Sequence, residues 1–276
     1  MVTLSGFGDE ISADLVEQMD VMESEGIRHV ELRGVWNTGV LRLTDEQRRE
    51  VKRQIDRRGF RISSIGSGLG KIKIDDDFAP HVRDCEIAIE TAKFFGCPYI
   101  RVFSFYVPQD APIRARREDV MRRMRTLTDM AAAEGIVLGH ENERHIYGEK
   151  PAECRDILDT IASPSLRAIF DPANFIQAGV RPYEEGWPLL KDDVVYFHIK
   201  DARLADGGVV PAGEGDGRIR DMLREKLVVE GWEGVLSLEP HLKIAGPAGG
   251  YSGPHSFKAA AQALKRILDD LGVAYS

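Results

Sequence analysis

Four short apolar runs in the second half of the chain each end in an acidic or imidazole side chain. The residues at these ends are Glu141, Asp171, His198 and Glu239. Such groups are costly to bury unless hydrogen bonds, an ion pair or a metal satisfies them. Three carboxylates brought together repel one another strongly, and a divalent cation removes that repulsion. One imidazole with three carboxylates suits Mn²⁺, Mg²⁺, Co²⁺ or Zn²⁺ better than a soft metal, so we predict that the four residues share one such ion.

These side chains can meet only if the runs that carry them are neighbouring strands. Short apolar runs alternate with longer amphipathic segments along the whole chain, a pattern typical of alternating strands and helices. The expected strands are residues 3–8, 29–33, 60–65, 99–103, 136–143, 166–170, 194–198 and 235–239. Eight such units in 276 residues predict an α/β fold, a (β/α)8 TIM barrel forming a single domain over residues 1–276. A doubly wound open sheet is the alternative, because strand counts from sequence can err.

Capping residues mark several of the helices between these strands. Thr44 followed by Gln47 has the pattern of a capping box, and Pro151 occupies a first-turn position where its missing N–H does no harm. Gly135 follows a helix, as a C-terminal signal does. The expected helices are residues 15–22, 44–59, 80–95, 117–134, 151–161, 183–190, 218–230 and 256–271.

Active sites of such barrels lie at the carboxyl ends of the strands, so the four predicted ligands would converge at one mouth. Removing a proton next to a carbonyl creates an enediolate, whose charge a metal stabilises. A base on one face of the carbon and an acid on the other then allow inversion. We expect Glu141 and Glu239 to flank a substrate in this way.

The segments around the four tips resemble those of the xylose isomerase-like sugar phosphate isomerase/epimerase superfamily of TIM barrels. The resemblance extends from Phe7-Gly8-Asp9-Glu10 to Glu239, and its motifs are His140-Glu141-Asn142, Phe170-Asp171-Pro172-Ala173-Asn174, Phe197-His198-Ile199-Lys200-Asp201 and Leu238-Glu239-Pro240-His241. It implies that Glu141, Asp171, His198 and Glu239 are the metal ligands. In ketose 3-epimerase members the matching glutamates are also the proton-transferring pair. Members form dimers or tetramers, so the resemblance implies a homodimer or homotetramer.

One residue departs from the superfamily pattern. Epimerase relatives carry a histidine three residues after the ligand aspartate, where this chain has Asn174. Asparagine can hydrogen-bond a hydroxyl but cannot carry charge or act as an acid near neutral pH. The departure leaves the exact reaction open between a metal-dependent sugar isomerase or epimerase and a lyase or dehydratase that expels a β-leaving group from a keto-sugar or related polyol.

Two further functions are weaker alternatives. The endonuclease IV branch of the superfamily cleaves phosphodiesters with a trinuclear zinc cluster that needs many histidines, whereas this chain has 7 in all, mostly away from strand tips. A non-catalytic sugar-binding or scaffold barrel that kept the site is the other alternative. Activity that is lost on chelation and restored by Mn²⁺ would exclude it.

Other polar residues at strand tips and in the following loops are predicted to contact a small sugar or sugar derivative. These candidates are Glu31, Arg33, Ser67, Lys71, Arg101, Asn142, Asn174, Lys200, Asp201, Glu214 and His241. A structural ion pair, such as Glu31 with a neighbouring arginine, is an equal alternative for several of them. The glycine-rich stretch at residues 66–71 has neither P-loop nor Rossmann spacing and is interpreted as a tight turn after a strand.

Composition excludes some partners. A net charge of −8 argues against a nucleic-acid-binding surface, which needs clustered lysine and arginine. No apolar run approaches the roughly 20 residues that cross a bilayer, and the N-terminal residues do not have the pattern of a signal peptide. Three cysteines, without the spacing of a metal knuckle, fit a reduced cytoplasmic compartment. We therefore expect a cytoplasmic enzyme that acts on a small molecule.

Overall fold

The expected strands form a closed parallel barrel in a computed structural model of the chain, which describes residues 1–108, 110, 112–242 and 252–276. Neighbours in the barrel follow one another in sequence, and the first strand closes the ring against the last. The barrel strands are β1 (Thr3–Phe7), β2 (His29–Leu32), β5 (Arg61–Leu69), β6 (Tyr99–Val102), β7 (Val137–Glu141), β8 (Leu166–Phe170), β9 (Val194–Ile199) and β12 (Val235–Leu238). The predicted (β/α)8 barrel is confirmed, and the open-sheet alternative is wrong.

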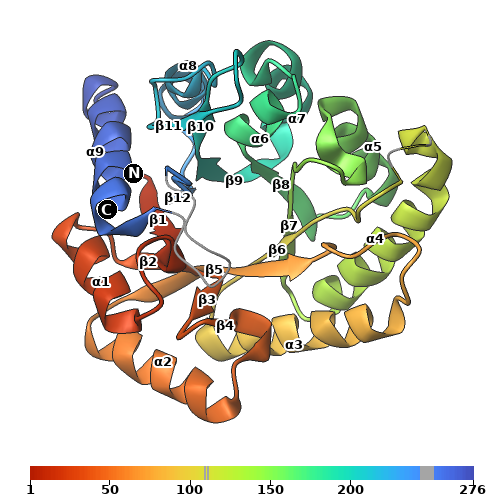
Figure 1. Ribbon diagram of the computed structural model, residues 1–276, viewed down its shortest axis with the longest axis horizontal. Coiled ribbons are helices and arrows are strands. Elements are labelled where there is room, and N and C mark those ends of the chain that lie inside the picture. The colour runs from red at the N-terminus through yellow and green to blue at the C-terminus, as the bar shows by residue number, and fades with distance from the viewer. Residues whose placement is uncertain (109, 111, 243–251) are drawn as a thin grey trace.

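Helices surround this barrel as an outer ring (Figure 1). They are α1 (Leu15–Ser24), α2 (Asp45–Arg57), α3 (Ala79–Phe95), α4 (Arg117–Ala133), α5 (Pro151–Ile161), α6 (Pro172–Gln177), α7 (Trp187–Leu190), α8 (Ile219–Leu223) and α9 (Gly253–Asp270). The predicted capping box is present at the start of α2: the Gln47 N–H donates to Thr44 Oγ1, and the Thr44 N–H donates to Gln47 Oε1. Capping therefore fixes where this helix begins.

Short elements fill the loops between the barrel strands and the helices. They are the small strands β3 (Gly34–Val35), β4 (Thr38–Gly39), β10 (Asp201–Ala202) and β11 (Val209–Val210), the 3₁₀ turns η1 (Gly8–Glu10), η2 (Val40–Arg42), η3 (Ile113–Arg116), η4 (Tyr147–Glu149) and η6 (Lys191–Asp193), and the π-helical turns η5 (Pro182–Gly186) and η7 (Arg224–Val229). The helix expected at residues 183–190 is thus divided between η5 and α7, and the one expected at 218–230 between α8 and η7.

The first part of the glycine-rich stretch at residues 66–71 still belongs to a strand, which corrects the sequence interpretation, and the expected tight turn begins only at its end, where the Lys71 N–H donates to the Gly68 carbonyl. Strand β5 continues to Leu69, which pairs with Val102 of β6. Gly66 is required inside the barrel because a Cβ there would lie 2.8 Å from the Phe7 ring. The chain turns at Gly70, whose φ of +86° is in the left-handed region that glycine tolerates.

Helix α6 was missed by the sequence interpretation, although its signals are present. Asp171 is its N-cap and accepts a 2.8 Å hydrogen bond from the Asn174 N–H. Pro172 follows in the first turn, where proline is favoured. A short helix therefore begins directly at a predicted metal ligand and orients the Asp171 carboxylate.

The middle of the barrel interior carries hydroxyl groups where branched aliphatic side chains are usual. Ser5 Oγ lies 2.7 Å from Ser63 Oγ, and Ser63 Oγ lies 2.9 Å from the Tyr196 hydroxyl. Ser237 pairs with Ser5 in the register of β12 and β1. We call Ser5, Ser63, Tyr196 and Ser237 the hydroxyl layer; all four are buried.

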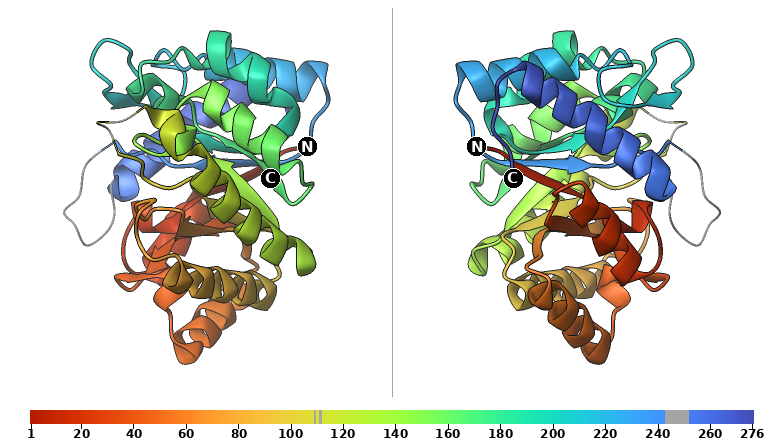
Figure 2. Two further views of the ribbon diagram at one scale, coloured as in Figure 1. Left: turned by 90° about the vertical axis from the view of Figure 1, so that its right-hand side faces the viewer. Right: turned by 90° about the vertical axis from the view of Figure 1, so that its left-hand side faces the viewer.

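The two ends of the described chain lie side by side. Val2 forms a parallel bridge with Tyr275, and the Val2 N–H donates to the carbonyl of Ala274. Helix α9 packs beside α1 on the outside of the barrel (Figure 2). Within the described residues, no helix combines the length and the apolar character needed to span a membrane.

Candidate metal centre and active site

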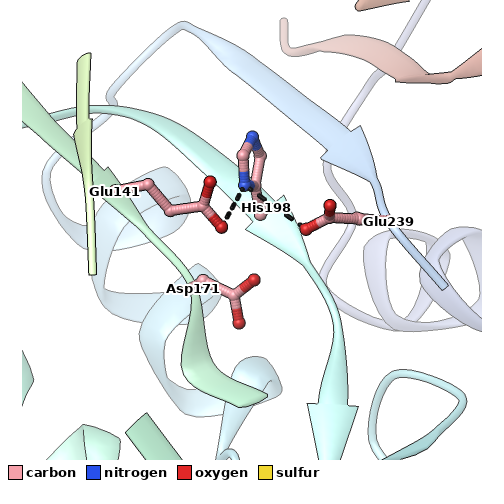
Figure 3. Close-up of side chains that lie close together, drawn as sticks. All are labelled: Glu141, Asp171, His198 and Glu239. Atoms are coloured by element: carbon pink, nitrogen blue, oxygen red, sulfur yellow. Dashed lines mark ion pairs between the residues drawn. The ribbon is translucent and has the colours of Figure 1, made fainter. Parts of the chain in front are cut away.

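Glu141, Asp171, His198 and Glu239 converge at the carboxyl-terminal mouth of the barrel (Figure 3). Glu141 ends β7 and His198 lies near the end of β9, whereas Asp171 and Glu239 directly follow β8 and β12. One potential ligand atom from each lies within 4.8 Å of the others, and all four residues are buried. The strand-tip pattern of the sequence therefore brings these four side chains to one point.

Two buried atoms of this cluster, Asp171 Oδ2 and His198 Nδ1, make no hydrogen bond of regular geometry among the described residues and are held by ion pairs alone, that of Asp171 Oδ2 being with Lys200 Nζ at 2.8 Å. His198 Nδ1 lies 3.1 Å from Glu141 Oε1 and 3.7 Å from a Glu239 oxygen, close enough for ion pairs but without hydrogen-bond geometry. Ligands at about 2.0–2.3 Å from a divalent ion stand at most about 4.5 Å apart. The donor set and its spacing therefore fit one divalent metal after a small inward movement.

The charges of the site also favour a cation. In the connected network of ion pairs around the four candidate ligands, the described carboxylates outnumber the cationic groups even if both imidazoles of the network are protonated. The carboxylates are Asp9, Glu10, Glu31, Glu141, Asp171 and Glu239, and the cations are Arg33, Arg101 and Lys200 with the imidazoles of His198 and His241. Buried like charges are costly unless they are compensated, so a divalent cation would stabilise this arrangement.

Burial and the neighbouring charges act in opposite directions on the pKa values of the candidate ligands. Burial and the neighbouring charges of Glu141 and Glu239 raise the pKa of Asp171 to about 7, although Lys200 acts in the opposite direction. Burial alone would raise the pKa of Glu141, but the charges of His198 and Arg101 outweigh it and lower that pKa to about 2. Burial would lower the pKa of His198, but Glu141 and Glu31 raise it to about 10. Without a metal, the imidazolium supplies part of the missing positive charge.

Two asparagines join the tips of β7 and β8. Asn142 Nδ2 donates to the Asp171 carbonyl at 2.9 Å, and the Asp171 N–H donates back to Asn142 Oδ1 at 3.0 Å. Asn174 Nδ2 donates to Glu141 Oε1 at 3.1 Å and to the Asn142 carbonyl at 2.9 Å. The residue that departs from the superfamily pattern thus orients the Glu141 carboxylate.

Lys200 and Arg101 supply buried positive charge beside the ligands. Lys200 Nζ lies 2.8 Å from Asp171 Oδ2 and 3.1 Å from Glu239 Oε2. Arg101 Nη1 lies 3.2 Å from Glu141 Oε2 and 3.6 Å from Glu239 Oε1. Although burial opposes it, the charge of Asp171 raises the pKa of Lys200, so this ammonium stays charged.

Arg33 and His241 form a second group of charges around Glu239. Arg33 pairs with Asp9, Glu10 and Glu239 at 2.8, 2.8 and 3.1 Å. His241 Nε2 lies 3.0 Å from Glu10 Oε1 and 3.5 Å from Glu239 Oε1. These contacts hold the Glu239 carboxylate through Oε1, whereas Lys200 contacts Oε2.

A cavity of about 630 Å³ opens over the centre. Of the four candidate ligands, Glu141 and Glu239 line it, whereas Asp171 and His198 are not among the described residues of its wall. The predicted contacts Arg33, Lys71, Arg101, Asn174, Lys200 and His241 also line it. A ligand in this cavity would therefore meet two carboxylates of the centre and a ring of cationic and amide groups.

A family model for the xylose isomerase-like TIM barrel matches residues 19–272. The chain belongs to this family. No curated protein matches the chain by sequence. The predicted superfamily is therefore confirmed by the family model together with the observed barrel.

Solved structures share this xylose isomerase-like fold at low sequence identity. A D-tagatose 3-epimerase-like protein has a TM-score of 0.76 at 17% identity, covering 98% of each chain. The probable 3-DHS dehydratase AsbF from Bacillus anthracis has a TM-score of 0.75 at 18% identity, covering 96% of this chain and 99% of that one. A xylose isomerase-like TIM barrel protein from Mycobacterium smegmatis in complex with magnesium has a TM-score of 0.67 at 20% identity, covering 97% of each. At such identities these likenesses show the fold alone.

Five of the predicted substrate contacts are not among the described residues that line the cavity of this xylose isomerase-like barrel: Glu31, Ser67, Asn142, Asp201 and Glu214. Ser67 Oγ donates to the Arg101 carbonyl at 2.5 Å, and Glu31 lies beneath His198. Asp201 accepts hydrogen bonds from the N–H groups of Gly213, Gly215 and Gly217, so it organises the loop after β9. Glu214 is exposed on that loop.

Several site residues lie outside the set that sequence reasoning selected. Asp9 and Glu10 hold Arg33, and the Phe7 ring packs edge-on against His198 with centroids 5.2 Å apart. These three residues lie at the tip of β1, so the strand-tip rule applied there would have found them. Arg144 also lines the cavity, but it follows β7 in a loop that gave no such signal.

Proposed function

We propose that the protein is a divalent-metal-dependent isomerase or epimerase of a sugar or sugar derivative, with Glu141 and Glu239 as its proton-transferring pair. The observation that carries this proposal is the division of the four candidate ligands. Glu141 and Glu239 line the cavity, whereas Asp171 and His198 lie behind it. Two carboxylates that reach a bound molecule from different strands can act on two faces of one carbon.

The surrounding residues would prepare each carboxylate for its role. Asn174 and Arg101 orient Glu141, and Arg33 and Lys200 orient Glu239. A carboxylate whose position is fixed by such contacts can accept and return a proton with little reorganisation. Arg101 lies within ion-pair distance of both carboxylates and would keep charge balanced as a proton moves between them.

A metal held by Glu141, Asp171, His198 and Glu239 would supply a Lewis acid that polarises a carbonyl next to the exchanged proton. Lys71 and Lys200, which line the cavity, offer donors for hydroxyl groups, and the Oδ1 of Asn174 offers an acceptor. Such donors suit a polyhydroxylated small molecule. The Mycobacterium smegmatis protein, which shares this fold and was solved in complex with magnesium, supports the binding of a divalent metal.

A second candidate is a lyase or dehydratase, which the uncharged Asn174 and the cavity-lining Lys200 favour. Elimination needs one base for the α-proton and one acid for the leaving group. Lys200, 3.1 Å from Glu239, is a fixed positive charge that would stabilise a leaving oxygen beside that carboxylate. The fold shared with a probable dehydratase supports this reaction class.

Proton exchange in deuterated solvent tests these proposals. The Mn²⁺-loaded protein would be incubated in D₂O with a panel of ketoses, aldoses and 3-keto-glycosides, followed by NMR. Epimers or aldose–ketose pairs carrying deuterium at one carbon are expected for an isomerase, and loss of water or aglycone identifies a lyase. If no member of the panel shows either deuterium exchange or turnover, both the isomerase and the lyase proposals are contradicted.

A further inference from the structure

The two ring nitrogens of His198 face opposite carboxylates. Nδ1 lies 3.1 Å from Glu141 Oε1 and faces the candidate metal centre, whereas Nε2 lies 3.2 Å from Glu31 Oε2. Figure 3 shows the second nitrogen pointing away from Glu141 and Glu239. An imidazole binds a metal through one nitrogen while the other donates a hydrogen bond. The partner of Nε2 therefore decides which nitrogen is left for a metal.

Glu31 is itself held in one position. It is buried, and its Oε2 accepts a 2.7 Å hydrogen bond from Ser237 Oγ. Ser237 pairs with His198 in the register of β12 and β9, so the hydroxyl and the imidazole reach Glu31 from adjacent strands. Ser237 also pairs with Ser5 of the hydroxyl layer in the register of β12 and β1. The Glu31 carboxylate is thus fixed between the imidazole and the hydroxyl layer.

A bulge in the sheet contributes to this arrangement. Val30 pairs with Ile62, but Glu31 pairs with Ser64, so Ser63 is an extra residue in β5. Ser63 points inward and joins Ser5 and Tyr196. Bulges often re-aim side chains next to active sites.

The hydroxyl layer has no access to substrate. None of its members, nor Glu31, is among the described residues that line the active-site cavity. Buried polar groups are costly in a barrel core unless they are hydrogen-bonded, and a hydrogen-bonded network of this kind fixes the positions of its members. Ser237 links the layer to the candidate centre by hydrogen bonds through Glu31 to His198. Tyr196 also packs edge-on against the His198 ring, with centroids 5.8 Å apart.

We propose that Glu31 is a positioning residue that holds the Nε2–H of His198 and thereby directs Nδ1 to a metal, and that Ser237 and the hydroxyl layer hold Glu31. This proposal rests on the metal centre of the proposed function. It gives Glu31 a role at the ligand in place of the substrate contact that the sequence predicted. Outer partners of this kind change metal affinity by about 10–100-fold when they are replaced.

Calorimetric titration of metal-stripped protein with Mn²⁺ tests the proposal. Glu31→Gln keeps the shape of the side chain and is expected to weaken Mn²⁺ binding by about 10–100-fold, with a smaller loss for Ser237→Ala. Ser64→Ala is the matched control. Ser64 is buried and pairs with Glu31 in the strand register, but its Oγ has no hydrogen-bonding partner among the described residues. It should bind Mn²⁺ like the wild type.

Cobalt-loaded protein gives a readout that a merely structural role would not change. Altered ligand geometry in Glu31→Gln should shift the visible Co²⁺ absorption bands, and Ser64→Ala should leave them in place. Urea unfolding of the metal-free variants separates lost stability from lost affinity, and Ser237→Ala replaces Glu31→Gln if the latter does not fold. Wild-type affinity and spectrum in the Glu31 and Ser237 variants would overturn the positioning role alone. A wild type that binds neither metal would overturn the metal centre and, with it, the positioning role.

Discussion

The ammonium of Lys200 lies 2.8 Å from Asp171 Oδ2, and both side chains are buried. It also lies 3.1 Å from Glu239 Oε2, so it neutralises two carboxylates that are candidate metal ligands. A fixed cation beside a metal centre has two effects. It stabilises the protein when no metal is bound, and it competes with the metal for the same oxygens.

Lys200→Met should therefore destabilise the metal-free protein strongly. Breaking a buried ion pair on one side costs about 3–5 kcal/mol, because the remaining charge is uncompensated. Excess Mn²⁺ should recover part of this loss by replacing the missing charge, which urea unfolding with and without Mn²⁺ would measure. Lys191→Met is the control, since Lys191 pairs with Glu225 near the surface and should change stability little. Equal stability of Lys200→Met and wild type without metal would contradict the expectation.

Removal of the metal should lower the melting temperature, and Mn²⁺ should restore it in a saturable manner. A ligand present at about 100 times its dissociation constant adds about 2.7 kcal/mol to the free energy of unfolding. Asp171→Asn should abolish the response. Asp201→Asn is a matched control, because Asp201 is also buried and accepts backbone N–H groups but lies outside the candidate ligand set. It should lower stability yet keep the Mn²⁺ response, as thermal unfolding would show.

Glu239→Gln and Glu141→Gln should each abolish turnover while largely preserving the fold. A positioned acid or base contributes about 10²–10⁴-fold to a proton transfer, and the amide cannot take that role. Rates would be measured at saturating Mn²⁺, with metal content determined for each variant. Glu143→Gln is the control. Glu143 lies two residues beyond Glu141 and lines the cavity, but it pairs with Lys71 and is outside the proton-transferring pair, so this variant should retain most activity. An unchanged rate in Glu239→Gln would remove that residue from proton transfer.

A fourth prediction concerns stability in acid, away from the active site. Hydrogen bonds from Arg117, and also from Tyr147, lower the pKa of Asp156 to about 2. A carboxylate with a depressed pKa contributes stability above its unfolded pKa of 3.8 and loses it as the pH falls toward 2. Asp156→Asn should thus cost about 1 kcal/mol at pH 7, after allowance for solvent screening. The difference from wild type should shrink below about pH 4, as urea unfolding across this range would measure.

Asp159→Asn provides the comparison for that experiment. Asp159 lies on the same helix α5 and pairs with Arg155, but its side chain is 66% exposed. It should change stability little at either pH. A constant difference between wild type and Asp156→Asn down to pH 3 would contradict the assigned role of the Asp156 carboxylate.

The barrel and the convergence of four polar tips followed from sequence because both rest on simple periodicities. Apolar runs in alternation with amphipathic segments predict the strands, and parallel strands must present their carboxyl ends together. Glu141, Asp171, His198 and Glu239 were therefore placed at one mouth without knowledge of any distance. The same reasoning placed Lys200 and Arg101 near them, and the structure puts both in ion-pair contact with ligand residues.

The partners of the remaining tips could not be predicted, because a position at a strand end does not say which way a side chain faces. Glu31 turns to His198 and Ser237 where a bulge shifts the register, and a bulge leaves no clear mark in sequence. Ser67 and Asp201 bind backbone groups whose positions depend on loops and neighbouring strands. These contacts depend on tertiary geometry, which a single strand pattern does not contain.

The closure of the barrel has a consequence for how the protein is made. Thr3 of β1 pairs with Val235 of β12, so one edge of the first strand has no barrel partner until residues 235–238 have been synthesised. During translation this edge must be shielded from other chains, because unpaired strand edges promote aggregation. Glu239 follows β12 and emerges at the same late moment. Assembly of the centre and completion of the barrel are therefore one event in biosynthesis.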